Sequence, residues 1–401
     1  MSKVFIVAAK RTAIGKFGGS LSAMSAADMA AIVIKDILDQ TGIDPAAIDE
    51  VIVGNILMAG QKQGIARQAA IKAGIPDQVP AWGLNMICGS GMKSIITAVN
   101  NIKAGEARLI MAGGTETMSG APFLLPASIR NGIKMGDIKA IDHMIIDGLT
   151  DAINDYHMGI TAENIAEKYQ ITREEQDAFA FSSQQKAVQA SDEGKFKDEI
   201  VPVEIATRRE TYIFDTDEYI NRTTSPEKLA KLRPAFKKDG TVTAGNASGI
   251  NDGASFVLVA SEEAVKEFGL TPLVEIIAVG QGGVDPAIMG MGPVPAIAKA
   301  LHKAKLKLSD MEVLELNEAF AAQSIGVIKQ LIADHDLSTQ WFDERCNVNG
   351  GAIALGHPIG ASGNRITVSL IYEMKRSGKK LGLASLCIGG GMGTALILKN
   401  V

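Results

Sequence analysis

The chain has 401 residues, of which 46% are hydrophobic and 21% charged, and a formal net charge of −5 at pH 7. This length exceeds what one hydrophobic core usually supports, so two domains or a duplicated fold are expected. The charge gives no reason to expect nucleic acid or an anionic membrane as a partner, and no stretch is apolar for long enough to span a bilayer. The N-terminus lacks the pattern of a signal peptide, and the three cysteines are too sparse for a disulfide framework. We therefore expect a reducing, cytoplasmic setting.

The first part of the chain alternates short apolar strands with amphipathic helices. Residues 4–7 predict a buried strand, residues 26–40 a helix that Gly42 ends, and residues 50–55 a second strand. A longer helix is expected to open at Cys88-Gly89-Ser90-Gly91 and to end at Gly105, before a strand at 109–112.

The same order of elements recurs from residue 273 onward. It predicts a strand at 274–279, a helix at 296–303, a strand at 312–317, a helix that opens at 360–363 and ends at Gly378, and a strand at 381–384. This repeated order of elements indicates two similar α/β halves, with mainly parallel sheets covered by helices. Two generic α/β domains that resemble each other by accident are the alternative.

A different pattern separates the two halves, because charged helical stretches alternate with polar loops between residues 121 and 249. We interpret this segment as an insertion carried on the first half, of a kind that often forms binding surfaces. Residues 253–260 then predict a strand that returns to the first half. The expected domains are therefore 1–120 with 250–270, the insertion at 121–249, and 271–401.

Cys88 is the first candidate for chemistry, since it lies between an apolar strand and the glycine-rich first turn of a predicted helix. Helix N-terminal amides and the helix dipole stabilise a thiolate, and small neighbours let a carbonyl carbon approach the sulfur. The alternative is that Cys88 is simply a small buried hydrophobic residue.

His357 lies in a loop of glycines and alanines ahead of a predicted helix, where a ligand can reach it. A nearly neutral imidazole is suited to activate a thiol, although a structural turn histidine would fit the same pattern. Cys387 precedes a run of glycines that can expose backbone N–H groups to an oxyanion, or it is an ordinary cysteine at a strand end. Asn317 also ends an apolar strand, where α/β folds gather their sites. A metal site of cysteine and histidine is disfavoured because no paired ligand spacing exists.

These motifs, taken together and in order, resemble the thiolase family over the chain from Val4 to its C-terminus. The motifs are Asn85-Met86-Ile87-Cys88-Gly89-Ser90-Gly91, Asn317-Glu318-Ala319-Phe320, Gly356-His357-Pro358, Cys387-Ile388-Gly389-Gly390-Gly391 and the stretch 245–253.

The resemblance implies a duplicated thiolase-like α/β fold with mixed sheets and an inserted loop domain. Within the family it points to acetyl-CoA C-acetyltransferase activity, in which two acetyl-CoA molecules give acetoacetyl-CoA and CoA. Cys88 is then the nucleophile and His357 its activator. Cys387 is the acid and base, Asn317 acts on the enolate through a water, and the amides of Cys88 and Gly389 hold the thioester oxygen.

The resemblance also implies a coenzyme A site, with the coenzyme as substrate and no tightly bound cofactor or metal. Met158 and Met289 match residues that close the acyl pocket in short-chain members. Arg222 follows Asn221, which stands where close relatives place an arginine, and Lys228 replaces a serine near the adenine. Matches along the pantetheine tunnel are His157, Met158, Phe236, Ala244, Ser248 and Phe320.

A homotetramer is implied as well, because residues 126–136, including Arg130, Lys134 and Met135, resemble the family's tetramer loop. The basic stretch 228–238 is expected to lie near the phosphates of coenzyme A, unless it is merely a solvated helix face. Rival functions are a degradative thiolase for longer 3-oxoacyl chains, a ketoacyl-carrier-protein synthase, a non-catalytic CoA or lipid carrier, and a redox protein. The second cysteine, Cys387, argues against the synthase, and the absence of a CxxC motif argues against the redox protein.

Overall fold

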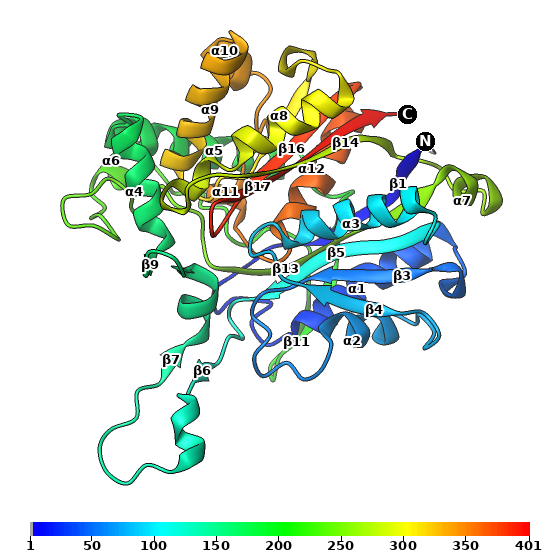
Figure 1. Cartoon of the computed structure of the whole chain (residues 1–401), viewed down its shortest axis with the longest axis horizontal. Helices are drawn as coiled ribbons and strands as arrows, with labels where there is room; N and C mark the ends of the chain where they lie inside the picture. The colour runs from blue at the N-terminus through cyan, green and yellow to red at the C-terminus, as the bar shows by residue number, and fades with distance from the viewer. Residues whose placement is uncertain (1–2) are drawn as a thin grey trace.

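The computed structural model describes residues 3–401 and contains one large mixed sheet that runs through both halves of the chain (Figure 1). Its strands follow the order β15-β16-β17-β14-β1-β13-β5-β3-β4, with the short β10 and β2 paired to β1 and β13. The strands of this sheet are β1 (Val4–Thr12), β2 (Gly15–Lys16), β3 (Glu50–Gly54), β4 (Ala81–Leu84), β5 (Leu109–Thr117), β10 (Ile200–Val201), β13 (Asn251–Ser261), β14 (Val274–Gly283), β15 (Val313–Leu316), β16 (Leu381–Ile388) and β17 (Met392–Asn400).

The sheet is arranged symmetrically about the pair β1 and β14, which are joined through Phe5↔Glu275 and Ile6↔Val274. Moving outward, β13, β5 and β3 on one side correspond to β17, β16 and β15 on the other. The duplicated fold predicted from the repeated elements is therefore confirmed. The expectation of mainly parallel sheets is wrong, because the long central strands β1, β13, β14 and β17 pair antiparallel with one another and with β5 and β16. Parallel pairing occurs among the outer strands and between β1 and the short β10.

Helices cover both faces of this sheet, and several strands are buried on both sides. Alternate residues of β5 point to different cores, with Leu109 and Met111 packed beneath the first-half outer helices and Ile110 packed with the central helices. The outer helices are α1 (Ala26–Thr41) and α2 (Ile65–Lys72) in the first half and α8 (Pro293–Ala304) and α9 (Ala321–His335) in the second. The central helices are α3 (Ser90–Ala104) and α12 (Ser362–Ser377).

The central helices α3 and α12 begin with the same Ser-Gly pair and touch at their first turns. A Cβ atom at Gly91 would lie 2.8 Å from the backbone nitrogen of Asn364, and one at Gly363 would lie 2.6 Å from that of Met92. Real Cβ atoms do not approach backbone so closely, so glycine is required at both positions. The close crossing brings the loops of Cys88 and His357, which precede the two helices, to one place.

The segment between the halves contributes helices, hairpins and one long excursion. The strand β13 returns between β1 and β5, as the apolar run at 253–260 predicts. The excursion carries β6 and β7 and projects away from the body of the molecule (Figure 1), with Phe123 68% and Met135 94% exposed. The elements of this segment are β6 (Phe123–Leu124), η2 (Ala127–Asn131), β7 (Ile141–Asp142), the π-helix η3 (Met144–Leu149), β8 (Thr150–Asp151), β9 (Tyr156–His157), α4 (Met158–Lys168), α5 (Arg173–Asp192), β11 (Val203–Ala206), β12 (Thr211–Phe214) and α6 (Pro226–Ala230).

Short helices complete the fold: η1 (Pro45–Ala47), α7 (Glu262–Glu267), η4 (Pro286–Met291), η5 (Leu308–Asp310), α10 (Thr339–Asp343) and α11 (Ala352–Leu355). No helix within residues 3–401 is both long and apolar enough to cross a membrane.

Candidate active site

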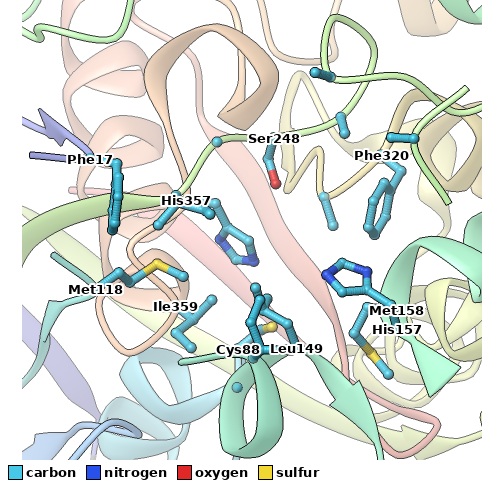
Figure 2. Close-up of a pocket in the computed structure, with 18 of the residues that line it drawn as sticks. Phe17, Cys88, Met118, Leu149, His157, Met158, Ser248, Phe320, His357 and Ile359 are labelled. Carbon is cyan, nitrogen blue, oxygen red and sulfur yellow. The ribbon is translucent and has the colours of Figure 1, made fainter. Parts of the chain in front are cut away.

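A cavity of about 550 Å³ lies between the inserted segment and the loops of both halves. Figure 2 shows the side chains of Cys88, His357 and His157 pointing toward its middle. Its walls are largely apolar, as expected for a pocket that excludes water around a reacting thioester. The lining residues are Lys16, Phe17, Ile87, Cys88, Met118, Ile145, Gly148, Leu149, His157, Met158, Tyr219, Ala235, Phe236, Ala244, Ala247, Ser248, Gly249, Ile250, Met289, Ala319, Phe320, His357 and Ile359.

Cys88 lies in a tight turn between β4 and α3, not within the first turn of the helix as the sequence predicts. The helix begins at Ser90. The Ser90 hydroxyl stabilises the turn, because it accepts a hydrogen bond from the N–H of Met86 and donates one to the carbonyl of Ile87. Ile87 has a φ of 44°, which is unusual for a β-branched residue and marks local strain. This strained turn projects the half-buried Cys88 into the cavity.

The surroundings of Cys88 favour the protonated form of its thiol. Burial raises its pKa to about 11, and the Glu116 carboxylate adds to the shift, while backbone N–H groups of Gly389 and of Cys88 itself oppose it. The same two N–H groups would stabilise negative charge on the sulfur or on an oxygen next to it. Because the thiol keeps its proton at neutral pH, a nearby base is needed to activate it.

His357 lines the same cavity, and its ring is held in one tautomer. Its Nδ1 lies 2.6 Å from the hydroxyl oxygen of Ser362, and that hydroxyl donates its only proton to the carbonyl of Pro358 at 2.9 Å. The hydroxyl must therefore accept from the histidine, so Nδ1 carries the proton and Nε2 carries the lone pair. Nε2 has no hydrogen-bond partner among residues 3–401.

Burial also keeps His357 neutral, because its ring lies almost entirely out of solvent. Desolvation, assisted by the positive charge of Arg365, lowers the pKa of His357 to about 3. A neutral ring with a free lone pair on Nε2 is the protonation state that a general base requires.

Cys387 lies behind the cavity, near the end of β16, and is 1% exposed. Burial raises the pKa of Cys387, and a thiolate at Cys88 would raise it further. Gly390 and Gly391 follow in the hairpin to β17 with φ values of 85° and 84°, and this turn directs the N–H of Gly389 toward Cys88.

Asn317 follows directly after β15 and is also buried behind the cavity wall. Its side-chain oxygen accepts a hydrogen bond from Arg365, and its Nδ2 has no partner within the described residues. The structure therefore brings Cys88 and His357 into the cavity itself and places Cys387, Gly389 and Asn317 in its supporting layer.

Most residues expected to bind coenzyme A line the cavity on the side of the inserted segment. His157 stacks on Phe236 with ring centroids 4.5 Å apart, and Phe236 meets Phe320 edge to face at 6.2 Å. These three aromatic rings form one wall of the cavity. Burial in this wall lowers the pKa of His157. The remaining expected residues in the lining are Met158, Ala244, Ser248 and Met289.

Arg222 and Lys228 lie outside this cavity. Arg222 forms an ion pair with Asp192 at the end of α5. Lys228 donates to the carbonyl of Thr223 and lines a neighbouring cavity of about 280 Å³, which shares Tyr219 and Ala244 with the first.

Several functional positions escaped the sequence analysis. Phe17, Met118 and Tyr219 line the cavity from loops, and Leu149 lines it from η3, all outside the sequence motifs. Ser362, by contrast, had a readable signal, since a serine that opens a helix five residues after a histidine can reach back to its ring.

Cysteine thiols, a histidine base and backbone donors around one apolar cavity define an enzyme of acyl transfer on a duplicated α/β fold. Models of the thiolase N-terminal domain and the thiolase C-terminal domain match residues 4–263 and 270–400. The acetyl-CoA acetyltransferase of Cupriavidus necator is 54% identical over 401 residues, which are 100% of both chains. The chain belongs to the thiolase family.

Solved structures agree with this assignment. The acetyl-CoA acetyltransferase from Syntrophomonas wolfei superposes with a TM-score of 0.96 at 42% identity and covers 100% of both chains. Human mitochondrial 3-ketoacyl-CoA thiolase superposes with a TM-score of 0.94 at 45% identity, over 100% of this chain and 99% of that one.

Proposed function

We propose that the protein is an acetyl-CoA C-acetyltransferase, which joins two acetyl-CoA molecules to acetoacetyl-CoA and CoA and also catalyses the reverse thiolysis. One observation carries this proposal: His357 and Cys88 line the same apolar cavity, and the Nε2 atom of His357 has a free lone pair and no hydrogen-bond partner within the described residues. The names of the relatives from C. necator and S. wolfei support the choice of acetyl-CoA.

In the first half-reaction, His357 takes the proton of Cys88 at Nε2, and the thiolate attacks the thioester carbonyl. The N–H groups of Cys88 and Gly389 hold the oxygen of the tetrahedral intermediate. The carbon–sulfur bond to coenzyme A then breaks, and the leaving thiolate takes a proton from Cys387. The products are CoA, acetyl-Cys88, an imidazolium at His357 and a thiolate at Cys387.

In the second half-reaction, the Cys387 thiolate removes a proton from the methyl group of a second acetyl-CoA. Asn317, through a water, and protonated His357 donate to the enolate oxygen. The enolate carbon attacks acetyl-Cys88, the new carbon–carbon bond forms, and the Cys88–carbon bond breaks. Cys88 recovers its proton from His357, so both thiols and the neutral histidine are restored. Two cysteines are needed because one sulfur carries the acyl group while the other moves a carbon-bound proton.

A thiolase for longer 3-oxoacyl chains is the second candidate, favoured by the similarity to human 3-ketoacyl-CoA thiolase. Met158 and Met289 line the cavity and favour a short acyl group in our proposal. The test is a steady-state assay of both directions across acyl chain length. Cleavage of acetoacetyl-CoA should exceed that of 3-oxooctanoyl-CoA, and the reverse order would favour the second candidate. A chain that only carries CoA would cleave neither substrate.

The nucleotide end of coenzyme A is proposed to lie near Lys228 and the basic residues that follow it. The neighbouring cavity lined by Lys228 supports this placement because it adjoins the main cavity through Tyr219 and Ala244. Replacing Lys228 and Lys231 together with glutamine should raise the KM for CoA substrates several-fold at low salt and less at high salt. The matched control is Lys375→Gln, which removes a charge from an exposed site on α12. Unchanged KM values at low ionic strength would mean that the basic stretch is only a solvated surface.

A homotetramer in the cytoplasm completes the proposal. The exposed apolar side chains of the excursion at 121–150 support the assembly, since isolated apolar surface of this extent usually marks an interface.

A further inference from the structure

Arg365 is a fully buried cation that contacts the end of β15, directly behind the cavity. It lies on the first turn of α12 and is 1% exposed. Its Nη2 donates to the side-chain oxygen of Asn317 at 3.3 Å, and its Nη1 lies 3.6 Å from Oε2 of Glu315. The guanidinium therefore holds two side chains of one strand end.

The contact with Arg365 decides which way the Asn317 amide faces. A guanidinium has only donors, so the amide oxygen must turn toward it and the amide NH₂ must turn away. The reverse orientation would set two donors against each other. The backbone is fixed as well, because the N–H of Asn317 donates to the carbonyl of Ser385 at 3.0 Å.

Three buried donor atoms in this region lack hydrogen-bond partners among residues 3–401: Nδ2 of Asn317 and the Nε and Nη1 atoms of Arg365. Unpaired buried donors are rare in folded proteins and often mark functional sites. Grouped donors beside a cation are suited to an oxygen that gains negative charge during a reaction.

The positive charge of Arg365 lies among several buried ionisable side chains. Burial raises the pKa of Glu315, and the Arg365 guanidinium opposes that rise. The cation also acts on the base of the site, since it lowers the pKa of His357. It therefore lies within electrostatic range of the reacting groups.

We propose that Arg365 is a positioning residue for carbon–carbon bond formation, because it orients the Asn317 amide so that its NH₂ faces the water that donates to the enolate oxygen. This inference rests on the proposed function. Asn317 serves only the enolate step, whereas His357 serves both half-reactions. Loss of Arg365 should therefore impair condensation far more than transfer of the acetyl group to Cys88.

The test compares condensation with exchange of acetyl groups between CoA molecules, which needs only the first half-reaction. Arg365→Met should lower kcat for condensation about 100-fold, the usual scale for a lost oxyanion donor. Acetyl exchange should fall far less, because it does not use Asn317 and responds only to the change in the pKa of His357 that loss of the cation causes. Arg365→Lys keeps a donor for the amide oxygen and should recover most of the condensation rate. Glu315→Gln is the matched control, since it removes the ion-pair partner but keeps the Asn317 contact.

A double-mutant cycle distinguishes this positioning role from a non-specific loss of activity caused by disturbed folding. Asn317→Ala should lower condensation by a similar factor, and adding Arg365→Met to it should cost less than about 2-fold more, since both act on one interaction. Should Arg365→Met not fold, Glu315→Gln combined with Arg365→Met removes the charged pair together and carries the same expectation. Equal losses of exchange and condensation, or additive losses in the cycle, would overturn the positioning role. Failure of the proposed function has a different signature, because the unaltered protein would then show no acetyl exchange at all.

Discussion

His357 is held as a neutral base by two contacts that act on different parts of its ring. The Ser362 hydroxyl accepts a hydrogen bond from the N–H of Nδ1, and burial disfavours a second proton on Nε2. The cost of this arrangement is that a buried neutral histidine opposes folding under acidic conditions, where the unfolded chain binds a proton and the folded chain does not.

Acid should therefore destabilise the protein through His357. Its pKa falls from 6.5 in the unfolded chain to about 3 in the folded one. The stability it contributes is complete above pH 6.5 and is lost as the pH falls toward 3. The melting temperature should drop more steeply between pH 6.5 and pH 4 in the unaltered protein than in His357→Asn, which lacks the titrating ring. Parallel curves for the two proteins would show that His357 is not buried in neutral form.

At the scale of single elements, the central helices decide where the two loops of the site meet. The sequence predicted their ends well, because Gly105 and Gly378 adopt left-handed conformations that terminate α3 and α12. It also indicated Gly91 and Gly363 as parts of a repeated motif. That these glycines touch the opposite helix is a tertiary fact, and no local pattern carries it.

Gly363→Ala should separate the two helices and lower the free energy of unfolding by about 1–3 kcal/mol, the usual range for overpacking. The cause is the added Cβ atom, which would lie 2.6 Å from the backbone of Met92. Denaturant unfolding measures the change. Lys375→Ala, at an exposed position on the same helix, should stay within about 0.5 kcal/mol of the unaltered protein. A Gly363→Ala variant as stable as this control would show that the crossing tolerates a side chain.

The remaining failures of sequence reasoning have similar causes. The strands were predicted too short, since β5 continues through Thr115, Glu116 and Thr117, whose polar side chains are buried in the fold. The alternation of strands and helices predicts parallel central strands. It does not reveal that β13 and β17 return antiparallel beside their neighbours, because that placement depends on the topology of the whole sheet. Arg365 was not predicted either, since its contact with Asn317 joins positions 48 residues apart.

At the scale of the whole molecule, the inserted segment completes the site and also exposes apolar surface. It supplies His157, Met158 and Phe236 to the cavity wall. The same segment carries the excursion that projects from the body (Figure 1), with Phe123 and Met135 strongly exposed. One insertion thus accounts for both this wall of the cavity and the proposed contact between subunits.

The tetramer proposal predicts that charges on the excursion reduce the assembly. Phe123→Asp with Met135→Asp should convert tetramers to dimers in light scattering at micromolar concentration, because buried unpaired charges are costly. Ile213→Asp is the matched control, since Ile213 is 56% exposed on a hairpin elsewhere in the insertion. A stable monomer of 42.2 kDa for the unaltered protein would contradict the proposal outright.

The division of labour between the two cysteines is the central claim, and acetylation by acetyl-CoA tests it most directly. Intact-mass measurement should show one acetyl group per chain in the unaltered protein and in Cys387→Ser, and none in Cys88→Ala. Cys387→Ser should also keep most of its acetyl exchange while condensation falls by several orders of magnitude, since a serine hydroxyl is a far weaker base than a thiolate. Stoichiometric acetylation of Cys88→Ala, or loss of exchange in Cys387→Ser as complete as its loss of condensation, would contradict the account.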